Sequence, residues 1–150
     1  MKLLNQKQLA ILLLGILTAP FLYLSFPRLP GSADPALGGF SREIALHGYC
    51  VLVVSFVAGI QWGIHYSKRT EDSVYLVSFL SLALAWVSLL AAGTMLGLSL
   101  MLLVVLLAWL EDRRMSKQRV TTLWFWQVRC ASSGVICLSL MLAIADLAGR

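Results

Sequence analysis

The longest stretch without a charged side chain, residues 73–110, limits what this chain can fold into more than any other feature. It runs for 38 residues. As a single helix it would be about 57 Å long, nearly twice the hydrocarbon core of a bilayer. The stretch must therefore reverse direction, and Ala92-Gly93-Thr94, with Gly97 close by, is the expected point. This predicts a tight hairpin of helices 74–91 and 95–110, with the shorter second helix shielded by its neighbours.

Composition agrees with a chain that lies mostly in a membrane. Hydrophobic residues make up 59% of the sequence and charged residues 13%, which is typical of an integral membrane protein. The net charge of +5 could suit a nucleic-acid partner, but the charges flank apolar runs and do not line one face. We therefore expect membrane lipids and no nucleic acid as partners. Three cysteines lie inside apolar runs without a CxxC motif, which favours packing over disulfides or metal binding.

Three further apolar segments, at about 9–26, 44–65 and 124–145, are long enough to span a bilayer. The first continues past Thr18-Ala19-Pro20, which favours an uncleaved span over a secretory signal. Pro20 should kink this helix and free backbone groups for a neighbouring helix to satisfy. Residues 27–42 contain three prolines and three glycines and are predicted to form a loop. The predicted fold is all-α, a single domain of five transmembrane helices spanning 1–150.

The distribution of basic residues predicts the orientation of this bundle. Glu111–Val120 is interpreted as a charged connection, Trp124-Phe125-Trp126 as an interfacial belt, and Arg129 as a side chain reaching toward headgroups. With five spans and the N-terminus inside, the outer segments hold Arg28, Arg42 and Arg150. Nine of the twelve basic residues lie inside: Lys2, Lys7, Lys68, Arg69, Arg113, Arg114, Lys117, Arg119 and Arg129. This bias predicts N-in and C-out in a bacterial cytoplasmic membrane.

The apolar segment 44–65 carries an organised line of polar residues. At 100° per residue, Glu43, His47, Gln61 and His65 lie within about 40° of one another on a helix. The two histidines are about 27 Å apart along the helix axis, so they cannot share a metal ion or a haem within one chain. The line therefore divides into an outer pair, Glu43 with His47, and an inner pair, Gln61 with His65.

Two interpretations of the histidines remain open. In the first, His47 and His65 lie at the two membrane interfaces, where headgroups, water or neighbouring side chains satisfy their rings. In the second, Gln61, His65 and Arg129 line a polar pocket near the inner leaflet, beside Trp62. Such a pocket could bind a lipid headgroup, a quinone ring or a small anion, because intramembrane polar groups often mark function.

Small residues recur at helical spacing on two of the predicted helices. Ser55, Gly59 and Gly63 form a small-xxx-small groove beside the polar line. The third helix has a similar stripe, Ser78, Ser81, Ala85 and Ser88. In lipid, such stripes allow helices to approach closely, since packing drives their association. We expect both to be helix-packing surfaces, with another helix of the bundle or a second protein as partner.

Two stretches carry a resemblance to a known family. Residues 47–67 resemble a segment of small bacterial membrane proteins with a run like SFxGGxHWG, matched here by Ser55-Phe56, Gly59 and Trp62-Gly63. Residues 110–139 resemble the family's second signature, a charged connection, an aromatic pair (Trp124-Phe125) and a following arginine (Arg129). The chain departs from the pattern at Gln61, where the family usually has histidine.

The family has no known function and includes the mitochondrial transmembrane protein 69. The resemblance implies an inner-membrane protein of about five helices and no particular reaction.

The sequence predicts no catalytic residues, metal ligands or cofactor. It contains no HExxH, no phosphate-binding glycine loop and no evident Ser/His/Asp set, although a membrane enzyme stays open as a third class. The leading expectation is an accessory or assembly subunit that binds another membrane protein, or forms a homo-oligomer, through its small-residue faces. The alternative is a small-molecule, lipid or quinone-binding protein, or a small transporter, using the pocket near Arg129.

Overall fold

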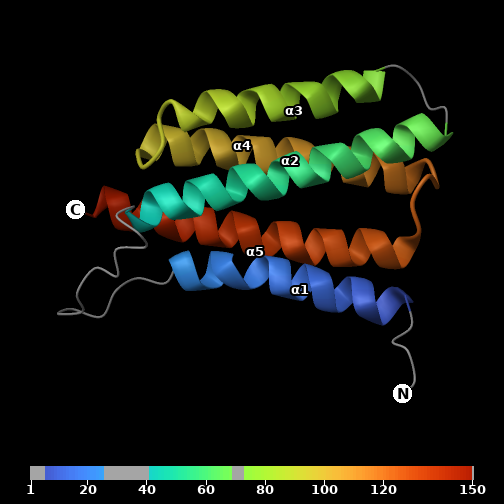
Figure 1. Ribbon diagram of the computed structural model, residues 1–150, viewed down its shortest axis with the longest axis horizontal. Helices are drawn as coiled ribbons and strands as arrows, with labels where there is room; N and C mark the ends of the chain where they lie inside the picture. The colour runs from blue at the N-terminus through green and yellow to red at the C-terminus, as the bar shows by residue number, and fades with distance from the viewer. Residues whose placement is uncertain (1–5, 26–40, 69–72, 150) are drawn as a thin grey trace.

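The computed structural model describes residues 6–25, 41–68 and 73–149, and within these ranges the regular elements are all helices. There are five, α1 (Gln6–Ser25), α2 (Arg42–Lys68), α3 (Ser73–Leu89), α4 (Met95–Lys117) and α5 (Leu123–Ala148) (Figure 1). Four of them, α1, α2, α4 and α5, are long and apolar enough to cross a membrane, and α3 is a shorter apolar helix. The all-α, five-helix prediction is confirmed, and the chain is a multi-pass membrane protein.

The helices run alternately up and down, so that the two ends of the chain lie at opposite ends of the bundle (Figure 1). Helix α4 packs against α2, α3 and α5, whereas α1 packs mainly against α2 and α5. In Figure 1, α3 and α1 form the two outer edges. The buried apolar core lies mainly between α2, α4 and α5, around Val54, Leu98, Met101, Val104 and Leu140.

The reversal between α3 and α4 falls at residues 90–94, where the long uncharged run was expected to fold back. Helix α3 ends at Leu89, and the next amides bond three residues back, as in Leu90 N to Val87 O at 3.1 Å. Gly93 has a φ of 77°, a conformation that glycine adopts without steric cost. The Thr94 side chain then caps α4 by accepting a hydrogen bond from Gly97 N at 3.2 Å.

Helix α4 continues to Lys117 instead of ending near Leu110, so the Glu111–Val120 stretch is mostly helix and not a connection. The reason is that Glu111, Asp112 and Met115 continue the buried face of α4 at helical spacing after Ala108. Of the four long apolar helices, α4 is the most buried, in line with the expected shielding. A Schellman turn closes it, with Val120 N bonded to Met115 O at 3.0 Å.

Helix α1 is attached to α2 at the end of the bundle where α1 finishes. Pro20 lies inside α1, and the Tyr49 hydroxyl donates to the nearby Leu17 carbonyl at 2.7 Å. Arg42 donates to the Tyr23 carbonyl at 2.6 Å, and the rings of Phe21 and Tyr49 are 4.9 Å apart. A neighbouring helix thus supplies a donor in the turn before the proline, although to the Leu17 carbonyl and not to that of Ile16, which Pro20 leaves without its helical N–H. Residues 27–40 of the predicted loop lie outside the described residues.

Candidate functional site

The polar line of α2 faces the interior of the bundle. His47, Gln61 and His65 belong to the buried stripe of this helix, which also contains Cys50 and Val54. Neither histidine ring is exposed, so the side chains around each ring, and not headgroups, are its surroundings. The outer and inner parts of the line have separate partners.

At the outer part, His47 pairs with α3. Its Nε2 lies 2.9 Å from Ser88 Oγ, and Ser88 Oγ donates to the Ala85 carbonyl at 2.6 Å. A serine hydroxyl has a single proton, so with Ser88 donating to Ala85 the Nε2–H of His47 donates to Ser88. His47 Nδ1 has no hydrogen-bond partner among the described residues. The imidazole thus joins α2 to α3 through one buried hydrogen bond.

At the inner part, Gln61, Asp112 and Arg129 form one buried network. Gln61 Nε2 donates to Asp112 Oδ1 at 2.9 Å and to the Ala108 carbonyl at 3.1 Å. Arg129 donates to Asp112 Oδ2 from Nε at 3.0 Å and from Nη2 at 2.7 Å. Ser78 Oγ donates to Gln61 Oε1 at 3.4 Å. The chain of bonds thus runs from α3 through α2 and α4 to α5.

This network neutralises Arg129 within the protein. The guanidinium is only 6% exposed, so Arg129 does not reach toward headgroups as expected from its place near the end of a span. Its charge is balanced by Asp112, and the second carboxylate oxygen is held by Gln61. A buried ion pair of this kind needs these further hydrogen bonds, because low polarity makes an unpaired charge costly.

Beside this network, His65 meets a second carboxylate of α4. His65 Nε2 lies 3.7 Å from Glu111 Oε1, and both side chains are buried. The His65 ring also contacts the Tyr75 ring, with centroids 6.2 Å apart. We call Gln61, His65, Ser78, Glu111, Asp112 and Arg129 together the inner polar cluster.

The structure brings the predicted residues Gln61, His65 and Arg129 into one region, but Gln61 and Arg129 meet only through Asp112. The two α4 carboxylates were missed, because they were assigned to a charged connection. A signal for them exists in the sequence. Ala108, Asp112 and Met115 continue the spacing of Met101 and Val104, so the buried face of α4 extends into the charged segment.

Trp62 and the two small-residue stripes occupy different places. Trp62 is 47% exposed on the outside of the bundle, with its ring 5.6 Å from that of Tyr75. The α3 stripe, Ser78, Ser81, Ala85 and Ser88, is buried within the bundle. By contrast, a Cβ atom added to Gly59 or Gly63 would meet nothing within 4 Å. The α3 stripe is used inside the chain, and the glycines of α2 are open on its surface.

The inner polar cluster connects helices α2 to α5 through side chains that bond to one another. Each of Asp112 and Arg129 is committed to the other. The described residues contain no group of three or more His, Cys, Asp or Glu side chains suited to a metal ion.

These features define the class: a multi-pass helical membrane protein whose helices α2 to α5 are tied by a buried polar network. The chain belongs to the family DUF3429, described as a protein of unknown function, whose profile matches residues 7–145. No curated protein and no solved structure gives a significant match.

Proposed function

We propose that this chain is a non-catalytic protein of the bacterial cytoplasmic membrane that acts as an accessory or assembly subunit for another membrane protein. The relationship to the mitochondrial transmembrane protein 69 is part of the same proposal. Its single strongest support is the open glycine face of α2, formed by Ser55, Gly59 and Gly63.

A glycine inside a helix costs roughly 0.5–1 kcal/mol relative to alanine. Among the described residues nothing offsets that cost at Gly59 and Gly63, since a Cβ atom added at either position would meet no atom of another element within 4 Å. A helix of another protein placed on this face would use the missing side chains for close contact. The open glycines therefore favour a partner over further packing within the bundle.

The surface around these glycines is shaped to receive a helix. A hollow of about 200 Å³ lies between α2 and α3 and is lined by Ser55, Gly59, Trp62, Phe79 and others. A second hollow of about 360 Å³ continues from Ser55 along Phe79 and Trp86. Both hollows are lined by small residues together with large apolar ones, and small residues let two helix backbones come close.

Cross-linking from the glycine face tests this proposal. A photoreactive amino acid in place of Gly59 should give one discrete product with a different membrane protein in native membranes. Adding Gly63→Leu should reduce that product about tenfold or more, because a leucine side chain separates the helix backbones. The yield is measured on denaturing gels, and the partner is identified by mass spectrometry.

Gly134 on α5 supplies the matched control, since a Cβ there also meets nothing within 4 Å, but Gly134 does not line the hollows beside Gly59. A photoreactive residue at Gly134 should give no such product, and Gly134→Leu should leave the Gly59 product unchanged. Equal products from both positions, or no product from either, would contradict the proposal that the glycine face of α2 is a specific binding surface. If the cross-linked product instead contains two copies of this chain, the protein self-associates through this face and the accessory role is wrong.

The proposed orientation is N-in and C-out. Helices α1 and α5 begin, and α2 and α4 end, at the same end of the bundle (Figure 1), where Lys7, Lys68 and Lys117 lie. The positive-inside rule assigns this end to the cytoplasm. A phosphatase reporter that is active only outside the cytoplasm should be active when fused after Arg150 and inactive when fused after Arg119. The reverse pattern would overturn the orientation.

A further inference from the structure

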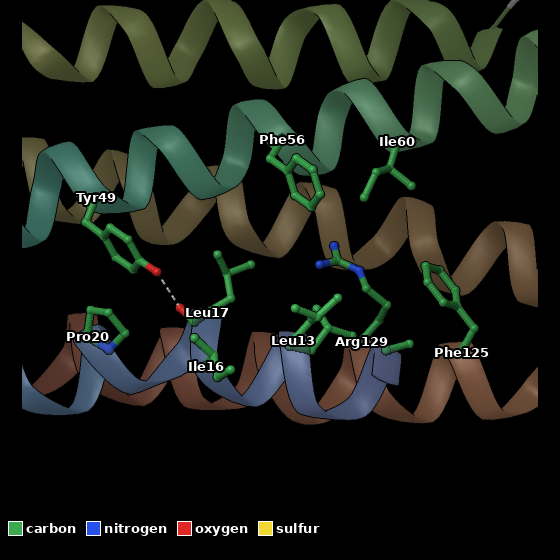
Figure 2. A pocket seen from close by; sticks show the side chains of 11 residues that line it. Leu13, Ile16, Leu17, Pro20, Tyr49, Phe56, Ile60, Phe125 and Arg129 are labelled. Carbon is green, nitrogen blue, oxygen red and sulfur yellow. Dashed lines mark hydrogen bonds between the residues drawn. The ribbon is translucent and has the colours of Figure 1, made fainter. Parts of the chain in front are cut away.

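A long apolar crevice opens between α1, α2 and α5, away from the glycine face. Its volume is about 570 Å³, within the range of small-molecule sites. Figure 2 shows its walls, with Leu13, Ile16 and Pro20 on α1 and Phe56 and Ile60 on α2. Phe125 and Arg129 of α5 complete the lining. Leu13, Ile16 and Phe56 are all more than half exposed, so the crevice opens sideways toward the lipid.

The crevice exists because α1 and α2 are held together toward one end. The Tyr49–Leu17 hydrogen bond and the Arg42–Tyr23 bond both lie toward the end of α1. From there the two helices diverge toward the start of α1 and the end of α2 (Figure 1). From Ala10 to Pro20 the lining extends about 15 Å along the α1 axis, which suits an extended hydrocarbon chain lying parallel to the helices.

Among the described residues that line this crevice, Arg129 is the one with a charged side chain. Its guanidinium points away from α5 into the space between α1 and α2 (Figure 2). Of its five N–H donors, the Nε–H and one Nη2–H bond to Asp112. The two on Nη1 and the other on Nη2 have no acceptor in the described part of the chain. In an apolar setting, an unsatisfied donor is costly.

The charge and depth of Arg129 select the chemistry of an occupant. Asp112 already balances the positive charge, so an uncharged acceptor oxygen fits better than a full anion. Arg129 lies three to five residues inside the interfacial Trp124 and Trp126, about 5–8 Å deeper along the helix. This depth matches a carbonyl oxygen below the phosphate level more closely than a phosphate.

From this geometry we propose that the α1–α2–α5 crevice binds a membrane amphiphile, with an uncharged carbonyl oxygen on the Arg129 guanidinium and one hydrocarbon chain between Leu13 and Phe56. The carbonyl can come from a quinone ring or from a lipid ester, because both offer the Arg129 guanidinium the same uncharged acceptor oxygen. The site goes beyond the proposed accessory role, because it lies on other helix faces and does not use Gly59 or Gly63.

Native mass spectrometry of the detergent-purified full chain tests the site. Three probes are titrated separately: decylubiquinone, a diacyl phosphatidylcholine, and a hydrocarbon of similar chain length without a carbonyl. We expect saturable binding of one molecule of the quinone or of the phospholipid, and whichever binds identifies the source of the carbonyl. The hydrocarbon should bind at least about tenfold more weakly, because it offers Arg129 no acceptor.

Two neighbouring residues on α1 give a matched pair of variants. Leu13 lines the crevice and Leu12 does not, yet their exposed fractions are similar, 56% and 51%. Leu13→Trp should weaken binding about tenfold or more by filling the crevice, while Leu12→Trp and Gly59→Leu should leave it unchanged. Both positions are exposed on α1, so neither tryptophan replaces a buried core side chain, and thermal unfolding of each variant checks that folding is preserved. Equal effects of both tryptophans, equal binding of the hydrocarbon, or no saturable binding would overturn the proposal.

Discussion

Replacing Asp112 with alanine should lower the free energy of unfolding by about 3–5 kcal/mol, because it leaves the Arg129 charge buried without a partner. The change also removes the acceptor of one Gln61 N–H group. Both losses occur at side chains that are almost fully buried. Thermal unfolding of the purified chain in detergent, followed by far-UV circular dichroism, measures the effect.

Asp146 is the matched control, since it is an exposed aspartate on α5 and Asp146→Ala should change the melting temperature little. The pair Asp112→Leu with Arg129→Met removes both charges together. It should be more stable than Asp112→Ala alone, because removing both partners leaves no unpaired ion. If Asp112→Ala melts at the same temperature as Asp146→Ala, the network has no role in stability.

Gly97→Ala should also destabilise the bundle, by about 1–3 kcal/mol, although alanine is the better helix former. A Cβ atom at Gly97 would clash with the backbone of Ala91 in the hairpin turn and lie 2.9 Å from His47 Cε1. The backbone cannot yield there without opening the turn or displacing His47 from Ser88. Thermal unfolding under the same conditions gives the size of the loss.

Gly134→Ala separates close packing from helix propensity. An added Cβ at Gly134 has open space around it, so this change should be neutral or stabilise by up to about 1 kcal/mol. A Gly97→Ala chain as stable as Gly134→Ala would mean that the hairpin turn does not press against the start of α4.

The sequence predicted the helices well because a bilayer restricts their lengths. A 38-residue run without charge has to turn back in lipid, and Gly93 is the residue that can adopt a φ of 77° there. The end of α4 was placed too early, at Leu110. A charged segment after an apolar run usually leaves the membrane, and only the contacts of Glu111 and Asp112 with other helices keep this one in the bundle.

The candidate site was predicted only in part. The line of His47, Gln61 and His65 was visible because residues of one helix keep a fixed angular relation. Their partners were not, since Asp112 is 51 residues from Gln61 and no local rule connects them. The crevice beside Arg129 depends on how α1 diverges from α2. The angle between two helices cannot be read from the spacing of residues in the sequence.

The sequence by itself determined the class of this protein: hydrophobic length and charge placement require a multi-pass helical chain, because unpaired backbone and unpaired charge are costly in lipid. Only the tertiary structure decided which faces are used. Both small-residue stripes recur at helical spacing, yet the α3 stripe is buried and the glycines of α2 are open. The difference arises because α3 turns its small residues toward the bundle, whereas α2 turns its line of His47, Gln61 and His65 inward and leaves Gly59 and Gly63 facing outward.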